Sequence, residues 1–152
     1  MHKYKTYPPT EYCSICKGNC CKRLPGPYHP SDFKETITKE FLTELLRSRK
    51  AVVDWWERRD RPGYFLRPPC VNDDGKIFCG SWGGTCSFLK EDGCSLKFED
   101  RPLGCRNLRP GKDGEDGDRC TTNYSKYEAY IAWSRYRSII EEIRDAKIQA
   151  SC

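Results

Sequence analysis

Hydrophobic residues recur at helical spacing between residues 31 and 50. The apolar positions with this spacing are Phe33, Ile37, Phe41, Leu42, Leu45 and Leu46. Intervals of three and four residues place such side chains on one face of a helix. Asp32 is a helix-start residue, and Glu35 follows it at the distance of a capping box. The pattern predicts a helix over much of 31–50, which Thr36 and Thr38 could split.

A second helical pattern fills the C-terminal part of the chain. No glycine or proline follows Gly117, and Ser125 with Glu128 forms another capping-box pattern. The stripe of imperfect 3.6-residue period consists of Tyr127, Tyr130, Ile131, Ser134, Ile139, Ile140 and Ile143. These positions predict a long helix from about 122 to 148.

The middle of the chain has the pattern of short strands and turns. In AVVDWWERRDRPGYF, β-branched and aromatic residues flank an RDRPG turn, and GTCSFLKEDGCSLKF places two short strands across a KEDG turn. The intervening stretch is rich in glycine and proline, which is typical of irregular backbone wrapped around a bound centre. We therefore expect one domain over residues 1–152, of the α+β class: small and loop-rich, with short antiparallel strands and a long C-terminal helix.

Cysteine is the residue that adds chemistry to this pattern. Four of the eleven cysteines crowd into CSICKGNCC, namely Cys13, Cys16, Cys20 and Cys21. The first two are spaced as a knuckle that binds one metal ion. Adjacent side chains diverge, so the last two supply two neighbouring sites, or one cluster and a spare thiol. The other seven cysteines are spread singly at positions 70, 79, 86, 94, 105, 120 and 152.

The redox compartment decides whether such cysteines form disulfides or bind metal. The first residues, MHKYKTYPPTEYC, contain no apolar signal region, and no stretch of the sequence has the length of a membrane span. We therefore expect a cytoplasmic protein with reduced thiols and no membrane partner. The alternative is a secreted domain stapled by disulfides, which the odd number of cysteines disfavours.

The positive charge of the chain is smaller than it first appears. The formal net charge is +5, from 27 Lys and Arg against 22 Asp and Glu. If eight thiolates held two dicationic centres, the sites would add 4 − 8 = −4, and the total would fall to about +1. A nucleic-acid partner is therefore disfavoured, and a protein or a small-molecule substrate stays open.

The cysteines also sit in a specific context. CxxCxxxCC followed by GxCxFLxxxGCxLxxxxRPxxCRxxxP resembles the CxxCxxCC family, a zinc- or iron-chelating domain of YkgJ-like cysteine-cluster proteins. The resemblance implies eight metal-binding cysteines, which here are Cys13, Cys16, Cys20, Cys21, Cys86, Cys94, Cys105 and Cys120. The chain departs from the pattern by its three residues between Cys16 and Cys20, and by Cys70 and Cys79, for which the roles of ligand and bystander stay open.

The spacing of the cysteines also bears on the metal. Structural zinc sites usually pair two knuckles, whereas this chain has one CxxC and many single cysteines, as in iron–sulfur proteins. We expect a 4Fe–4S cluster, with zinc as the alternative. The cluster would serve redox or group-transfer chemistry; the competing interpretation is a non-catalytic, zinc-stabilised module that binds a protein or nucleic acid. Whether the protein is an enzyme, its catalytic residues, its substrate and its oligomeric state are not indicated.

Two arginines lie beside the last part of the motif. Arg101 and Arg106 flank Cys105, and an anionic thiolate centre needs nearby donors that hold its charge. They are candidate cofactor-binding residues. The alternative is a structural role, in which they pair with carboxylates near the thiolates.

Overall fold

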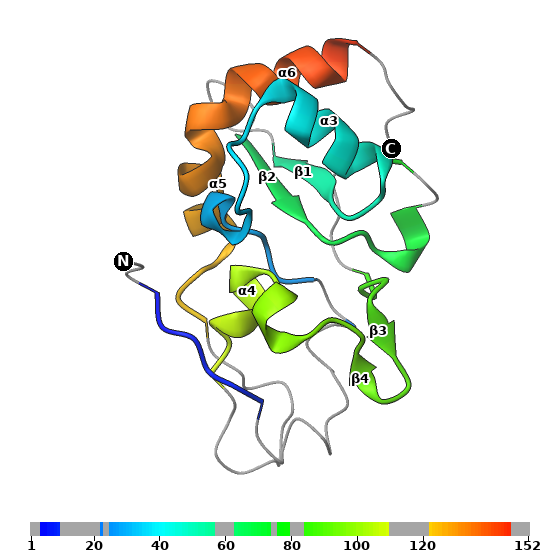
Figure 1. Ribbon diagram of the computed structural model, residues 1–152, viewed down its shortest axis with the longest axis vertical. Coiled ribbons are helices and arrows are strands. Elements are labelled where there is room, and N and C mark those ends of the chain that lie inside the picture. The colour runs from blue at the N-terminus through cyan, green and yellow to red at the C-terminus, as the bar shows by residue number, and fades with distance from the viewer. Residues whose placement is uncertain are drawn as a thin grey trace.

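The protein divides into a hydrophobic half and a cysteine-bearing half. The computed structural model describes residues 4–9, 22, 25–56, 63–73, 76–79, 84–109 and 122–146. Figure 1 shows the hairpin β1–β2 with the helices α3, α5 and α6 in one half, and α4 with the small hairpin β3–β4 in the other. This arrangement confirms the predicted α+β class. Among the described helices, none has both the length and the apolar character needed to cross a membrane.

Both predicted hairpins are confirmed. β1 (Val52–Trp56) pairs antiparallel with β2 (Gly63–Arg67), and β3 (Leu89–Lys90) pairs antiparallel with β4 (Gly93–Cys94). The free edge of β1 is used as well, because Val53 forms a parallel bridge with Phe78. β2 is buried from Tyr64 to Arg67, with α5 packed against it.

The predicted helix over 31–50 is present only in its second half. α3 (Lys39–Arg47) begins after Thr38, whose side chain accepts a hydrogen bond from the amide of Phe41 at 3.1 Å. Thr38 is one of the two threonines expected to split the helix. The predicted pairing of Asp32 with Glu35 is wrong, because Asp32 instead closes a capping box with His29 around the 3₁₀ turn Pro30–Asp32.

The long C-terminal helical segment is confirmed, with a change of direction within it. α5 (Lys126–Trp133) is followed directly by a 3₁₀ turn (Ser134–Tyr136) and by α6 (Arg137–Asp145). The hydroxyl of Ser134 donates to the carbonyl of Ile131 at 2.7 Å, a local bond that often bends helices. α5 buries Tyr130 and Trp133 while Ile131, on its other side, is 51% exposed, and after the turn α6 buries Ile140 and Ile143.

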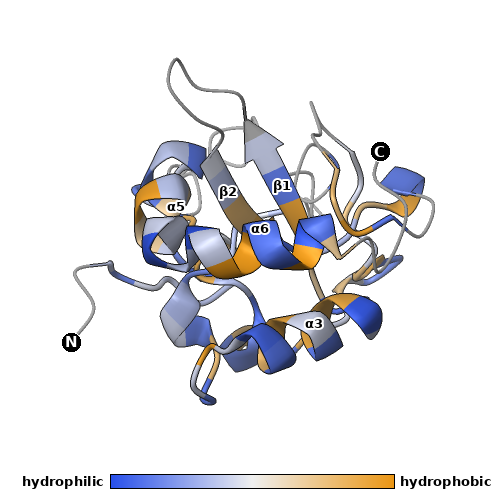
Figure 2. Ribbon diagram, turned by 90° about the horizontal axis from the view of Figure 1, so that it is seen from above, coloured by the Kyte–Doolittle hydropathy of each residue, from blue (hydrophilic) through white to orange (hydrophobic). Residues whose placement is uncertain are grey.

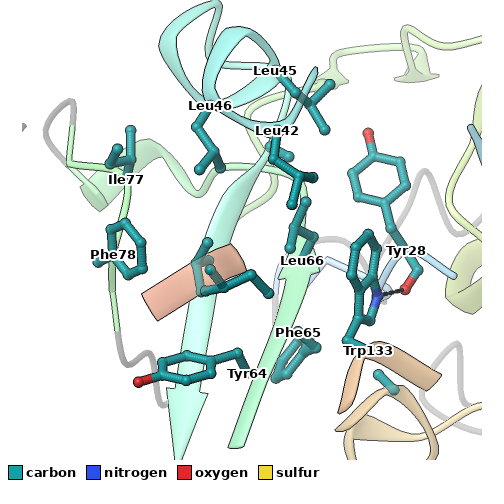
Figure 3. Close-up of a cluster of buried hydrophobic side chains, with 14 of the residues drawn as sticks. Tyr28, Leu42, Leu45, Leu46, Tyr64, Phe65, Leu66, Ile77, Phe78 and Trp133 are labelled. Atoms are coloured by element: carbon teal, nitrogen blue, oxygen red, sulfur yellow. Dashed lines mark hydrogen bonds between the residues drawn. The ribbon is translucent and has the colours of Figure 1, made fainter. Parts of the chain in front are cut away.

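The hydrophobic core lies between the hairpin and the three helices. Figure 2 shows hydrophobic and hydrophilic residues alternating along α3 and α6, as helices with one buried face require. Figure 3 shows leucines of α3 over β2, with Tyr28 and Trp133 beside them. The indole of Trp133 donates to the carbonyl of Tyr28 at 2.7 Å, and the hydroxyl of Tyr124 donates to the same carbonyl at 2.8 Å. The segment after the CSICKGNCC motif is thereby anchored to the core.

Candidate metal centre

Some of the predicted ligands lie among the described residues and others do not. Cys86, Cys94 and Cys105 lie within it, whereas the predicted ligands Cys13, Cys16, Cys20, Cys21 and Cys120 lie outside the described residues. The two cysteines of open role, Cys70 and Cys79, are also described. The arrangement of these five thiol positions therefore carries the structural evidence on the site.

Cys70 and Cys86 face each other across an isolated antiparallel bridge. The amide of Val71 donates to the carbonyl of Thr85 at 2.9 Å, and the amide of Ser87 donates to that of Pro69 at 2.8 Å. These bonds flank the two cysteines, which makes them a non-hydrogen-bonded pair with side chains on the same face. Both thiols are 4% exposed. Sequence spacing gave no sign of this pairing, because 15 residues separate the two positions.

Cys86 lies at the start of the turn that leads into β3. Burial raises the pKa of its thiol to about 11, while hydrogen bonds from the backbone amides of Phe88 and Leu89 act in the opposite direction. Cys94, at the end of β4, is opposite Leu89 in the register of the small hairpin. Two amide donors directed at one sulfur fit a thiolate ligand, because metal-bound sulfur carries negative charge that such donors stabilise.

Cys105 lies in the short helix α4 (Leu103–Arg106), tightly against the segment of Gly26. A Cβ atom at Gly26 would lie 2.8 Å from the sulfur of Cys105 and 2.5 Å from its amide nitrogen. Only glycine allows this approach of the two backbones. The segment that follows the CSICKGNCC motif therefore passes directly beside a predicted ligand.

The predicted ligands that are described act on the pKa of Tyr28. Burial raises the pKa of its hydroxyl, and negative charge on Cys105, Asp32, Cys86 and Cys94 raises it further, in that order. The three described ligand candidates therefore lie within electrostatic range of one phenol. Sequence reasoning missed this residue, which has no feature that separates it from the other tyrosines.

A buried ion cluster lies beside Cys70. Arg67 is fully buried, and its guanidinium donates to Asp54 at 2.8 Å and to Asp73 at 3.1 Å. The same group reaches the sulfur of Cys70 at 3.4 Å, and Asp73 accepts the amide of Cys70 at 2.6 Å. Burial raises the pKa of the Cys70 thiol, and the charge of Arg67 opposes that shift. The one sequence signal for this cluster was an acidic residue inside the apolar stretch AVVDWW.

The two predicted cofactor-binding arginines support the segment that carries Cys105. Arg106 forms an ion pair with Asp32 and donates to the carbonyl of Arg101 at 2.9 Å. Arg101 donates to the carbonyl of Leu96 at 3.2 Å. Asp32 also accepts the amide of Leu103 at 2.8 Å, at the beginning of α4. Their contact with a cofactor stays a prediction; the bonds described here position the backbone around Cys105.

Asn107, at the end of α4, is hydrogen-bonded to the N-terminal segment and to the segment that precedes α5. Its side chain is buried, its amide nitrogen donates to the carbonyl of Lys5 at 2.7 Å, and its oxygen accepts from the hydroxyl of Thr122 at 2.9 Å. That oxygen also accepts the backbone amides of Asn123 and Tyr124, at 2.7 and 3.0 Å. The described residues before Cys13 and after Cys120 are thus fastened to the end of α4. Sequence reasoning missed Asn107 as well.

The oxidation states of the described cysteines are mixed. The reduced ones are Cys70, Cys86, Cys94 and Cys105. Cys79 is disulfide-bonded. Within the described ranges, no three His, Cys, Asp or Glu side chains are grouped closely enough to hold a metal ion.

Comparison with known proteins gives one match. The model of the CxxCxxCC family, whose description is "Putative zinc- or iron-chelating domain", matches residues 12–129. This range includes all eight predicted ligands. No curated protein and no solved structure matches the chain.

Proposed function

This chain belongs to the CxxCxxCC family of zinc- or iron-chelating domains, and we propose that it holds an iron–sulfur centre of the 4Fe–4S type through cysteine thiolates. The proposed ligands are drawn from a set of eight, which would serve two four-thiolate clusters or one cluster with thiols to spare: Cys13, Cys16, Cys20, Cys21, Cys86, Cys94, Cys105 and Cys120. A cluster with four cysteine ligands would serve electron transfer, whereas a cluster with three would leave one iron open for group-transfer chemistry.

The observation that carries the proposal is that negative charge on Cys86, Cys94 and Cys105, which belong to separate elements, acts on the one phenol of Tyr28. These three predicted ligands therefore lie within electrostatic range of a single side chain. A bound metal would use thiolates brought near one another in this way, and its binding would be coupled to folding.

Chain connectivity limits how far the CSICKGNCC motif can lie from the segment of Cys105. Tyr7 donates its amide to the carbonyl of Arg106 at 2.8 Å, and Gly26 touches Cys105. Cys13 is six residues beyond Tyr7, and Cys21 is five residues before Gly26. An extended chain covers at most about 3.5 Å per residue, so these cysteines lie within about 21 Å and about 17 Å of those anchors. The reach of the chain is compatible with one shared centre.

Purification without oxygen tests the proposal most directly. We expect iron and acid-labile sulfide in similar amounts, together with broad visible absorption that bleaches on reduction. Cys94→Ser and Cys105→Ser should each lower the iron content, whereas Cys152→Ser, which removes a thiol outside the proposed set, should not. A colourless sample with stoichiometric zinc would contradict the iron–sulfur proposal and favour the zinc-stabilised module for binding a protein or nucleic acid.

A further inference from the structure

The Cys70–Cys86 pair has the geometry of a disulfide that has not yet formed. In a non-hydrogen-bonded antiparallel pair the Cα atoms are about 4.5 Å apart, at the short end of the range of about 4.4–6.8 Å that disulfides span. Both side chains leave the bridge on the same face, and both thiols are reduced. Formation of an S–S bond therefore requires side-chain rotation rather than a change in strand register.

Cys70 has a cation beside its sulfur. The guanidinium of Arg67 lies 3.4 Å from the sulfur and opposes the rise in the thiol pKa that burial causes. The pair itself is buried, but Val71, which follows Cys70, is 66% exposed, and Thr85, which precedes Cys86, is half-buried. Partly exposed chain therefore borders the buried pair on both strands.

We propose that Cys70 and Cys86 are a redox modification site, which a peroxide converts into a reversible cross-strand disulfide. The thiolate of Cys70 attacks one oxygen of hydrogen peroxide, the O–O bond breaks, and hydroxide departs. Cys70 is now a sulfenic acid, and the hydroxide takes up the proton that Cys70 released and becomes water. The sulfur of Cys86 then attacks this sulfenic sulfur, the S–O bond breaks, and the oxygen leaves as water with the thiol proton. In sum, two thiols and one peroxide give one disulfide and two waters. A dithiol reverses the reaction by thiol–disulfide exchange and is itself oxidised to a cyclic disulfide.

A disulfide between Cys70 and Cys86 would also weaken metal binding, a consequence that rests on the proposed function. Cys86 is a proposed metal ligand, whereas Cys70 is not in the proposed set. A disulfide between them removes one ligand from the centre, because a sulfur in a disulfide is no longer a thiolate. Oxidation of this pair would therefore compete with metal binding, and a bound metal would protect Cys86 from oxidation.

The test uses the full-length protein, reduced without oxygen and freed of metal by a chelator. The sample is titrated with hydrogen peroxide, remaining thiols are alkylated, and linked peptides are identified by mass spectrometry. We expect the Cys70–Cys86 link to be the major product at one equivalent of peroxide, and dithiothreitol to return both thiols. Links from Cys86 to Cys94 or Cys105 in its place, or a Cys70 that stays alkylatable while other cysteines oxidise, would overturn the proposal.

Variants and metal separate this proposal from the previous one. Cys70→Ser should reduce disulfide formation at Cys86 at least tenfold, whereas the matched change Cys152→Ser should leave the Cys70–Cys86 link intact. Loading with Zn²⁺ before oxidation should protect Cys86 in the wild-type protein. If the link forms equally fast with and without bound Zn²⁺, the disulfide proposal stands and the ligand role of Cys86 fails. If no link forms in the metal-free wild-type protein, the disulfide proposal fails and the metal proposal is untouched.

Discussion

Arg67 carries a fully buried positive charge, which two buried carboxylates compensate. Taking such groups out of water costs several kcal/mol per ion, which their mutual attraction and hydrogen bonds must offset. The guanidinium satisfies this requirement through Asp54, Asp73 and the carbonyl of Pro68. The cluster also joins β1, β2 and the segment of Cys70, so that it fixes one half of the redox pair.

Arg67→Met should therefore destabilise the protein strongly, because it leaves two buried carboxylates without their cation. We expect a loss of about 3–5 kcal/mol in the free energy of unfolding, measured with urea. The matched control is Arg137→Met, which breaks a partly exposed i,i+4 pair with Glu141 and should cost less than about 1 kcal/mol. Adding Asp54→Asn and Asp73→Asn to Arg67→Met should recover part of the loss. Equal effects of the two arginine variants would contradict this account.

Buried acids make the metal-free protein sensitive to high pH. The folded state raises the pKa of Cys86 from 9.0 to about 11, and burial also raises the pKa values of Tyr28 and Tyr124 above 10.0. The unfolded chain therefore loses these protons first, and the stability present below about pH 9 falls as the pH rises further. Cys86 alone should contribute on the order of 2 kcal/mol to the fall between about pH 9 and pH 11. Urea unfolding of the reduced, metal-free protein across this range measures it.

The same experiment on Cys86→Ala provides the comparison. This variant should lose less stability over the range, because only the two tyrosines still contribute. A stability that stays constant or increases with pH in the wild-type protein would show that folding does not raise the pKa values of the thiol and the phenols.

At the scale of elements, the segment of Cys105 is held by side-chain hydrogen bonds, whereas strand pairing holds the segments of Cys70, Cys86 and Cys94. Asn107 is the clearest case, because one side chain accepts three hydrogen bonds and donates a fourth. Asp32 has the same function on the other side of α4, where it accepts the amide of Leu103 and pairs with Arg106. These two side chains set the position of Cys105 relative to the N-terminal segment and to α5.

Asn107→Ala should loosen this arrangement. The substitution removes the four hydrogen bonds of this side chain, of which the one from the amide of Tyr124 is buried, and each such bond contributes about 0.5–1.5 kcal/mol net. We expect a total loss of about 2–4 kcal/mol and a lower metal content of the purified protein. Asn123→Ala is the control, because Asn123 is exposed and uses its backbone amide rather than its side chain for the bond to Asn107. Unchanged stability and metal content in Asn107→Ala would refute a fastening role.

The sequence predicts these elements where local chemistry determines them. The hairpins follow from β-branched strands and turn residues, and the delayed start of α3 follows from the cap at Thr38. The contacts of the site depend instead on residues far apart in the chain. Arg67, Asn107 and Tyr28 act through partners that folding brings near, and no local pattern distinguishes them from exposed residues of the same type. The pairing of Cys70 with Cys86 likewise depends on tertiary structure, whereas the nearby motif cysteines were recognisable from spacing.

At the scale of the whole molecule, the two halves differ in what holds them together. The hydrophobic core draws its buried residues from α3, the β1–β2 hairpin, α5 and α6. Within residues 84–109, Leu103 is the one side chain that belongs to this core. Apolar burial therefore stabilises the first half, while the second half depends on side-chain hydrogen bonds and, under the proposed function, on metal–thiolate bonds.

Removal of metal should consequently affect the two halves unequally. We expect hydrogen exchange to accelerate at amides of 84–101 after chelation, because this segment loses its bonds to the centre, whereas β1, β2 and α5 should keep most of their protection. Hydrogen exchange followed by mass spectrometry resolves the two regions in the same sample. Re-addition of the metal should restore protection in 84–101, which excludes damage by the chelator. Uniform loss of protection in both halves would mean that the metal holds the entire fold, and an unchanged pattern would mean that it holds neither half.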